Sequence, residues 1–139
     1  MKTYTANTAQ ETYEIGEKMG RSAKQGDVIA LYGGLGAGKT VFAKGYASGL
    51  GVCEDVMSPT FTLLRQYKGR VTLCHFDLYR IEDEQELEHI GFYDFLGAEN
   101  VCVIEWPENV SELDANIVVR IEGSGSEPRY IEIEEKRAQ

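Results

Sequence analysis

The sequence predicts a three-layer α/β fold, in which helices cover both faces of a mixed, mostly parallel sheet. Three observations lead to this fold class. The apolar run Asp27–Tyr32 precedes a glycine-rich loop and a helical pattern, and the run Val101–Ile104 is typical of a strand inside a parallel sheet. Near the end of the chain, two alternating segments flank Gly123-Ser124-Gly125 and predict a C-terminal β-hairpin. The 139 residues are expected to form one domain, residues 1–139.

Two helices are predicted around the first strand. Thr8 and Glu11 have the spacing of a capping box, and the apolar residues behind them recur every four positions, as one face of a helix does. These apolar residues are Ile15, Met19 and Ala23. Gly26 is expected at the exit of this helix. A second helix is predicted after the glycine-rich loop and before Gly51, from the apolar residues Val41, Phe42, Tyr46 and Leu50.

The second half of the chain predicts further strands and one acidic helix. Residues 61–67 and 71–79 flank the turn Lys68-Gly69 and are expected to pair as a hairpin. An acidic segment follows and is predicted to be helical up to Gly91. Its densest charges are Glu82, Asp83, Glu84, Glu86 and Glu88. This cluster is interpreted either as a solvated helix face or as a docking face for a basic partner.

The composition argues against direct, tight binding of RNA or DNA by this chain. Fourteen basic and twenty-three acidic residues give a formal net charge of −9, and the basic residues are scattered. No apolar run approaches the roughly 20 residues needed to cross a bilayer, so no membrane association is expected. The three cysteines are far apart and form no CxxC pair, which favours a reducing cytoplasm over a disulfide framework or a zinc site.

The segment Tyr32–Thr40, YGGLGAGKT, contains the pattern G-x-x-x-x-G-K-[ST] between Gly33 and Thr40. Its glycines allow backbone N–H groups to turn toward phosphate oxygens, and the N-terminus of the following helix adds a positive dipole end. Lys39 is expected to reach the β- and γ-phosphates, and the Thr40 hydroxyl is expected to ligate magnesium. The motif therefore predicts the phosphate cradle of a P-loop NTPase-like fold.

Two carboxylates end apolar strands in the same chain. Asp77 ends VTLCHFD, and Glu105 ends NVCVIE. Because parallel strands carry their sites at the carboxyl edge, either residue could face the phosphates. A nucleotide-hydrolysing site needs one acidic group for magnesium and one group that orients the attacking water. The spacing leaves open which residue takes which role.

Three further residues have two interpretations each, and two more are interpreted as structural. Thr60 is either a switch-type threonine for the γ-phosphate or an ordinary turn residue. Arg65 and Arg80 are either charge stabilisers or surface arginines. His75 lies in the middle of a strand and is interpreted as a packed or supporting residue rather than a ligand. Trp106 is interpreted, from the residues alone, as a core aromatic beside a turn.

Four motifs occur in order along the chain: GxLGAGKT, SPTF, HFDLYR and IEWPE. Together they resemble the TsaE family, bacterial P-loop ATPases of the threonylcarbamoyladenosine tRNA-modification pathway. The resemblance extends from the N-terminal helix to Glu108 and implies ATP or ADP and Mg²⁺ as cofactors. The nucleotide-binding residues that it implies are Gly33, Gly34, Leu35, Gly36, Ala37, Gly38, Lys39, Thr40, Val41 and Trp106. The catalytic residues that it implies are Glu105, Asp77, Lys39 and Thr60, and the implied metal ligands are Thr40, Glu105 and Asp77.

The same resemblance implies protein partners. In this family, ATP hydrolysis supports a TsaB–TsaD pair that transfers the threonylcarbamoyl group to an adenosine next to the tRNA anticodon. The chain is then expected to work in the cytoplasm and to meet tRNA only through that complex, with no DNA or membrane contact. Slow turnover alone is expected, with stimulation by the partners. The family usually has Asp where this chain has Gly34, so a carboxylate near the nucleotide or a partner is lost while the cradle is expected to survive.

Three other classes of protein share a phosphate loop. A GTPase would carry an N-K-x-D motif, which is absent from this sequence. A small-molecule kinase would usually close an arginine-rich lid over the phosphates, and no such segment is evident. A nucleotide-gated binding module, in which ATP shapes a docking surface, is the non-enzymatic alternative. The pair of Asp77 and Glu105 favours hydrolysis over that alternative.

Overall fold

The computed structural model describes residues 1–57 and 63–136. The strands in this part of the chain form one seven-stranded sheet in the order β1-β7-β6-β2-β5-β4-β3. Their bounds are Lys2–Ala6 (β1), Val28–Tyr32 (β2), Leu64–Tyr67 (β3), Thr72–Asp77 (β4), Asn100–Glu105 (β5), Ile117–Glu122 (β6) and Arg129–Glu135 (β7). The central strands β6, β2, β5 and β4 pair in parallel, whereas β7, β1 and β3 join by antiparallel pairs at the two sides.

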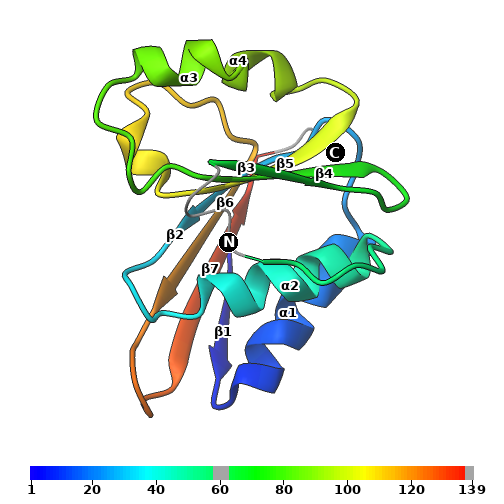
Figure 1. Cartoon of the computed structure of the whole chain (residues 1–139). Helices are drawn as coiled ribbons and strands as arrows, with labels where there is room; N and C mark the ends of the chain where they lie inside the picture. The colour runs from blue at the N-terminus through cyan, green and yellow to red at the C-terminus, as the bar shows by residue number, and fades with distance from the viewer. Residues whose placement is uncertain (58–62, 137–139) are drawn as a thin grey trace.

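Helices lie on both faces of the sheet, as predicted (Figure 1). Helices α1 (Ala9–Arg21) and α2 (Lys39–Gly49) cover one face. The short helices α3 (Gln85–His89) and α4 (Phe92–Phe95) cover the other, and a 3-10 turn, η1 (Pro107–Asn109), follows β5. The three-layer α/β fold class is thereby confirmed. No helix in the described ranges is long and apolar enough to span a membrane.

The two faces of the sheet have separate hydrophobic cores, and β5 contributes to both. Val101 and Val103 belong to the core beneath α1 and α2, whereas Cys102 and Ile104 belong to the core beneath α3 and α4. Successive residues of a strand point to opposite faces, so the side chains of β5 alternate between the two cores along the strand. A strand that is buried on both sides reads as a continuous apolar run, which explains the VCVI pattern.

The predicted boundaries of the first two helices were partly confirmed. The Glu11 N–H donates to the hydroxyl oxygen of the N-cap Thr8 at 3.1 Å, which is one half of a capping box. The Glu11 carboxylate accepts the N–H of Asn7, one residue before the N-cap, at 3.1 Å. Helix α2 stops just before Gly51, whose φ of 85° ends the helical path. Gly26 does not end α1, which stops at Arg21; it has a φ of 92° in the turn before β2.

Two other expectations needed correction. The acidic segment is helical only from residue 85 to residue 89, because Gly91, with a φ of 74°, interrupts the path before α4 begins. The sequence prediction also missed β1, which pairs with β7 from Lys2 to Ala6. Its residues KTYTA are mostly polar, since β1 is the outermost strand of the sheet and only Ala6 is fully buried.

Helices α1 and α2 approach each other through glycines. Gly16 and Gly20 of α1 contact the backbone of α2, and Gly45 and Gly49 of α2 contact the backbone of α1. Each pair has the four-residue spacing of one helix face. A Cβ atom at Gly45 would lie 2.0 Å from the carbonyl oxygen of Tyr13, so the two backbones are in direct contact there. This contact fixes α2, and therefore the loop in front of it, relative to the N-terminal segment.

Candidate functional site

The glycine-rich loop connects β2 to α2. Gly36 and Gly38 have φ values of 79° and 104°, which side chains with a Cβ rarely adopt. Gly38 is the N-cap of α2, and Lys39 is the first helical residue. The first backbone N–H groups of a helix have no partner within it, and the helix dipole is positive at this end. The loop therefore presents an anion-binding helix terminus at the carboxyl end of β2.

Lys39 is buried at this terminus, with only 6% of its surface exposed. Its Nζ atom has no hydrogen-bond acceptor within the described ranges and lies 3.9 Å from the centroid of the Trp106 ring. Burial lowers the pKa of Lys39 below its usual 10.5, whereas Glu105, Asp77 and Glu108 oppose that shift. A buried cation without an acceptor is costly, and a phosphate would supply the missing oxygens. The residues present thus fit a nucleotide phosphate.

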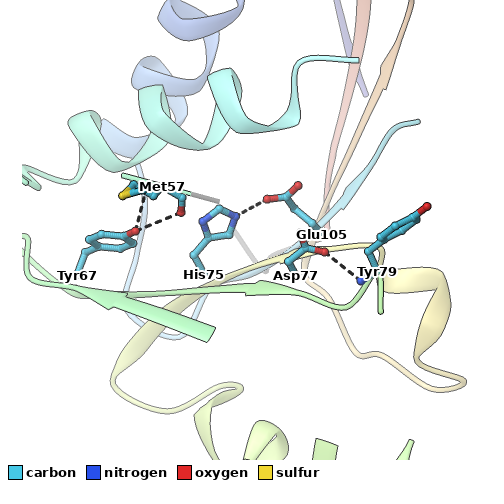
Figure 2. Close-up of polar contacts among 6 residues, drawn as sticks. All are labelled: Met57, Tyr67, His75, Asp77, Tyr79 and Glu105. Carbon is cyan, nitrogen blue, oxygen red and sulfur yellow. Dashed lines mark hydrogen bonds and ion pairs between the residues drawn. The ribbon is translucent and has the colours of Figure 1, made fainter. Parts of the chain in front are cut away.

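Asp77 and Glu105 lie side by side at the carboxyl ends of adjacent parallel strands, β4 and β5, where they are direct register partners. Glu105 shares the face of Val103, and the same alternation puts Asp77 on the face of Leu73, beneath α2. Both are buried, with 5% and 4% of their surfaces exposed. Figure 2 shows the two side chains near each other at the strand ends. Both carboxylates therefore lie at the carboxyl edge of the parallel strands, from which either was expected to face the phosphates.

Each carboxylate has a different supporting contact (Figure 2). The Asp77 Oδ1 atom accepts the backbone N–H of Tyr79 at 3.0 Å. The Glu105 Oε2 atom lies 2.5 Å from the Nε2 atom of His75, which is fully buried. His75 is thus a packed, supporting residue, as predicted. It holds one oxygen of Glu105 and leaves the carboxylate with a defined orientation.

A cavity of about 590 Å³ joins these groups, a volume within the usual range for small-molecule sites. The predicted residues that line it are Gly34, Leu35, Gly36, Gly38, Lys39, Thr40, Val41, Asp77, Glu105 and Trp106. Trp106 forms part of the wall together with Tyr79, whose ring centroid lies 4.8 Å from its own. Trp106 is only half-buried, so it is a cavity residue rather than a fully enclosed core aromatic.

The remaining predicted residues lie elsewhere. Gly33 and Ala37 belong to the loop but are not among the lining residues, and Ala37 is buried beneath it. Arg65 and Arg80 do not line the cavity either. Thr60 lies outside the described residues. Met57, just before that gap, is held by the Tyr67 hydroxyl, which accepts its N–H at 3.1 Å and donates to its carbonyl at 3.3 Å (Figure 2).

Sequence reasoning missed two parts of the cavity wall. One is the segment around the N-cap of α1, from Ala6 to Thr12. The other is the β6–β7 hairpin, which contributes Gly125, Glu127 and Arg129. The capping box identified Thr8 as a helix start, but nothing in its spacing pointed to a cavity. Arg129 contacts Ala37, which lies 92 residues earlier in the chain, and no sequence pattern around Arg129 indicated that contact.

The donor set suits magnesium only together with a nucleotide. No cluster of three or more His, Cys, Asp or Glu side chains able to hold a metal ion occurs in the described part of the chain. Magnesium in nucleotide sites is held by one or two protein oxygens, with phosphate oxygens and waters as the other ligands. The Thr40 hydroxyl, Asp77 and Glu105 provide hard oxygen donors of that kind.

Gly34 is exposed, and a Cβ atom built on it has no neighbour within 4 Å. Its φ lies outside the left-handed range, so the backbone does not require glycine here. The position would therefore accept a larger side chain without displacing the loop. Glycine in place of the family's usual Asp therefore removes a carboxylate from the loop, and it does so without a change that the loop backbone requires.

The fold and the site together define an α/β protein of the P-loop NTPase-like class. The family model "Threonylcarbamoyl adenosine biosynthesis protein TsaE" matches residues 6–132, and the chain belongs to the TsaE family. It is 42% identical over 125 residues to the tRNA threonylcarbamoyladenosine biosynthesis protein TsaE of Treponema pallidum, covering 87% of this chain and 93% of the relative. The Bacillus subtilis TsaE protein is 40% identical over 134 residues, with 94% and 83% covered.

A solved structure agrees with the fold. The crystal structure of Bacillus subtilis YdiB superposes with a TM-score of 0.76 at 32% sequence identity, and the match covers 94% of this chain and 82% of that one. The match extends over nearly the whole chain, so the mixed sheet and its helices are shared with a solved structure. The α/β architecture is thereby supported independently of the sequence motifs.

Proposed function

We propose that this protein is a magnesium-dependent ATPase that supports a TsaB–TsaD pair in the threonylcarbamoyl modification of a tRNA adenosine next to the anticodon. The observation that carries the proposal is the buried Lys39 ammonium group. It has no hydrogen-bond acceptor within the described ranges and lies at a helix N-terminus that shares a cavity with two carboxylates. The relatives named above are tRNA threonylcarbamoyladenosine biosynthesis proteins, which supports the pathway. The protein acts in the cytoplasm and does not itself transfer the group.

In this proposal, the loop and Lys39 bind the β- and γ-phosphates. Thr40 and Asp77 would be the protein groups that hold magnesium, which would supply neutralisation of charge on the phosphate oxygens. Glu105 orients the attacking water. The His75 contact supports this division, because it fixes one oxygen of Glu105 and leaves the other available. Tyr79 and Trp106, whose rings lie against each other, form part of the cavity wall beside the carboxylates.

No arginine among the described residues that line the cavity is free to reach a phosphate, and this predicts a partner-dependent rate. Among the described lining residues the only arginine is Arg129, and its guanidinium donates to backbone carbonyls. Arginine fingers contribute roughly 10³- to 10⁵-fold to phosphoryl transfer. Slow ATP turnover by the protein alone is therefore expected, with a rise of about tenfold or more when TsaB and TsaD are added. Phosphate release, measured while the two partners are titrated, tests this. ATP turnover that stays constant across the titration would show that the partners do not stimulate hydrolysis.

A further inference from the structure

We propose that Arg129 is a positioning residue for the phosphate loop, which it holds in a binding-ready conformation by fixing the loop's carbonyl groups to the β6–β7 hairpin. This inference rests on the proposed function, because it takes the loop to be where a nucleotide's phosphates bind. Arg129 is the first residue of β7, directly after the hairpin turn. It borders the same cavity as Lys39.

The contacts of Arg129 join two loops that are distant in sequence. Its Nε atom donates to the Ala37 carbonyl at 2.9 Å, and its Nη2 atom donates to the Gly36 carbonyl at 3.2 Å. On the hairpin side, Nη2 donates to the Gly125 carbonyl at 3.2 Å, and Nη1 donates to the Glu127 carbonyl. Every one of these acceptors is a backbone carbonyl. The guanidinium group therefore links the phosphate loop to the hairpin. Its acceptors are present whatever side chains the two loops carry, because every residue has a backbone carbonyl.

Fixing these carbonyls also fixes the neighbouring N–H groups. A trans peptide is planar, and its C=O and N–H point in opposite directions. The Ala37 carbonyl points at Arg129, so the N–H of Gly38 in the same peptide plane points away from the guanidinium. The Gly36 carbonyl likewise sets the Ala37 N–H, which donates to the Gly34 carbonyl at 3.2 Å. Arg129 thereby sets two successive peptide planes in a loop whose glycines would otherwise leave them free to rotate.

A loop that is already ordered binds an anion more tightly, because less conformational entropy is lost on binding. The guanidinium also contributes its positive charge, since no carboxylate contacts Arg129 within the described ranges. Charge and positioning are separable effects. Lysine at position 129 would retain the charge but would lack the planar fork that reaches the Gly36 and Ala37 carbonyls together.

The test compares Arg129→Met and Arg129→Lys with Arg120→Met, a matched loss of one positive charge. Arg120 is an exposed residue on the neighbouring strand β6, where its guanidinium lies 4.8 Å from the centroid of the Tyr32 ring. Hydrogen exchange at the backbone amides of residues 36–40 is measured in the nucleotide-free proteins. Dissociation constants for ATP and for ADP are then measured by calorimetry. Amides of β2 and β5 report whether the sheet remains folded.

Arg129→Met is expected to speed exchange at residues 36–40 by about tenfold or more and to weaken ATP and ADP binding by a similar factor. Arg129→Lys should recover less than half of the lost affinity on a logarithmic scale, and Arg120→Met should match the wild type. Unchanged exchange in Arg129→Met would overturn the inference, and so would full recovery by Arg129→Lys. If the wild type bound no ATP, the proposed function would fail, while the exchange measurement would still decide the role of Arg129.

Discussion

Replacing Glu105 by Gln is expected to lower ATP turnover by about 100-fold or more, while the dissociation constant for ATP changes by less than about threefold. The amide retains the size of the carboxylate, so the cavity and the loop stay in place. The amide cannot accept a proton from the attacking water, and it lacks the negative charge that orients this water. Phosphate release measured at saturating ATP, together with calorimetric binding, separates the two effects. A variant with near wild-type turnover would rule out the proposed role of Glu105.

Variants at two neighbouring positions, Asp77 and His75, accompany that experiment. Asp77→Asn should also lower ATP turnover more than it weakens nucleotide binding. Its loss of turnover should diminish at high magnesium concentration, because Asp77 is assigned to the metal.

His75→Gln retains an N–H donor that can reach the Glu105 carboxylate, so it should keep more ATP turnover than His75→Ala. Equal losses in the two His75 variants would contradict a positioning role for this histidine.

Gly45→Ala is expected to lower the free energy of unfolding by about 3 kcal/mol or more. The added Cβ would lie 2.0 Å from the carbonyl oxygen of Tyr13 and 2.8 Å from its carbonyl carbon, so α1 would have to move away from α2. Backbone atoms cannot rotate out of the way, as the end of a flexible side chain can. The expected sign is opposite to intrinsic helix propensity, by which Ala is favoured over Gly by about 1 kcal/mol. Urea-induced unfolding followed by circular dichroism measures the change.

Gly34→Ala is the matched control for this substitution. It adds the same methyl group where no atom lies within 4 Å and where the backbone is not left-handed. Its stability should therefore remain within about 0.5 kcal/mol of the wild type. A Gly45→Ala protein as stable as the wild type would show that α1 and α2 separate without cost, in conflict with the close contact of their backbones.

Much of the site could be predicted from the sequence because its signals are local. The loop follows a buried strand and begins a helix, so its function depends on residues that are adjacent in the chain. Asp77 and Glu105 each end an apolar strand, and the rule that parallel strands share a carboxyl edge was enough to bring them together. The register that makes them direct neighbours was not needed for that prediction.

The features that were missed depend on contacts between distant segments. Gly16, Gly20, Gly45 and Gly49 share a four-residue spacing, but only the approach of the two helices shows that these glycines meet backbone. The bond between Arg129 and the Ala37 carbonyl spans 92 residues. The contact of His75 with Glu105 is diagonal across the β4–β5 register, in which His75 is paired with Val103. Patterns along one segment carry no information about such pairings.

Calorimetric titration of wild type and Lys39→Ala with ATP and magnesium tests the central claim, that this loop and its lysine hold the phosphates of a nucleotide. We expect Lys39→Ala to bind ATP about 100-fold more weakly or worse, because a buried charge-assisted contact is lost. The variant should unfold no more readily than the wild type without nucleotide, since burial already disfavours the charged form of Lys39. Unaltered ATP affinity in a folded Lys39→Ala protein would show that Lys39 does not hold the phosphates.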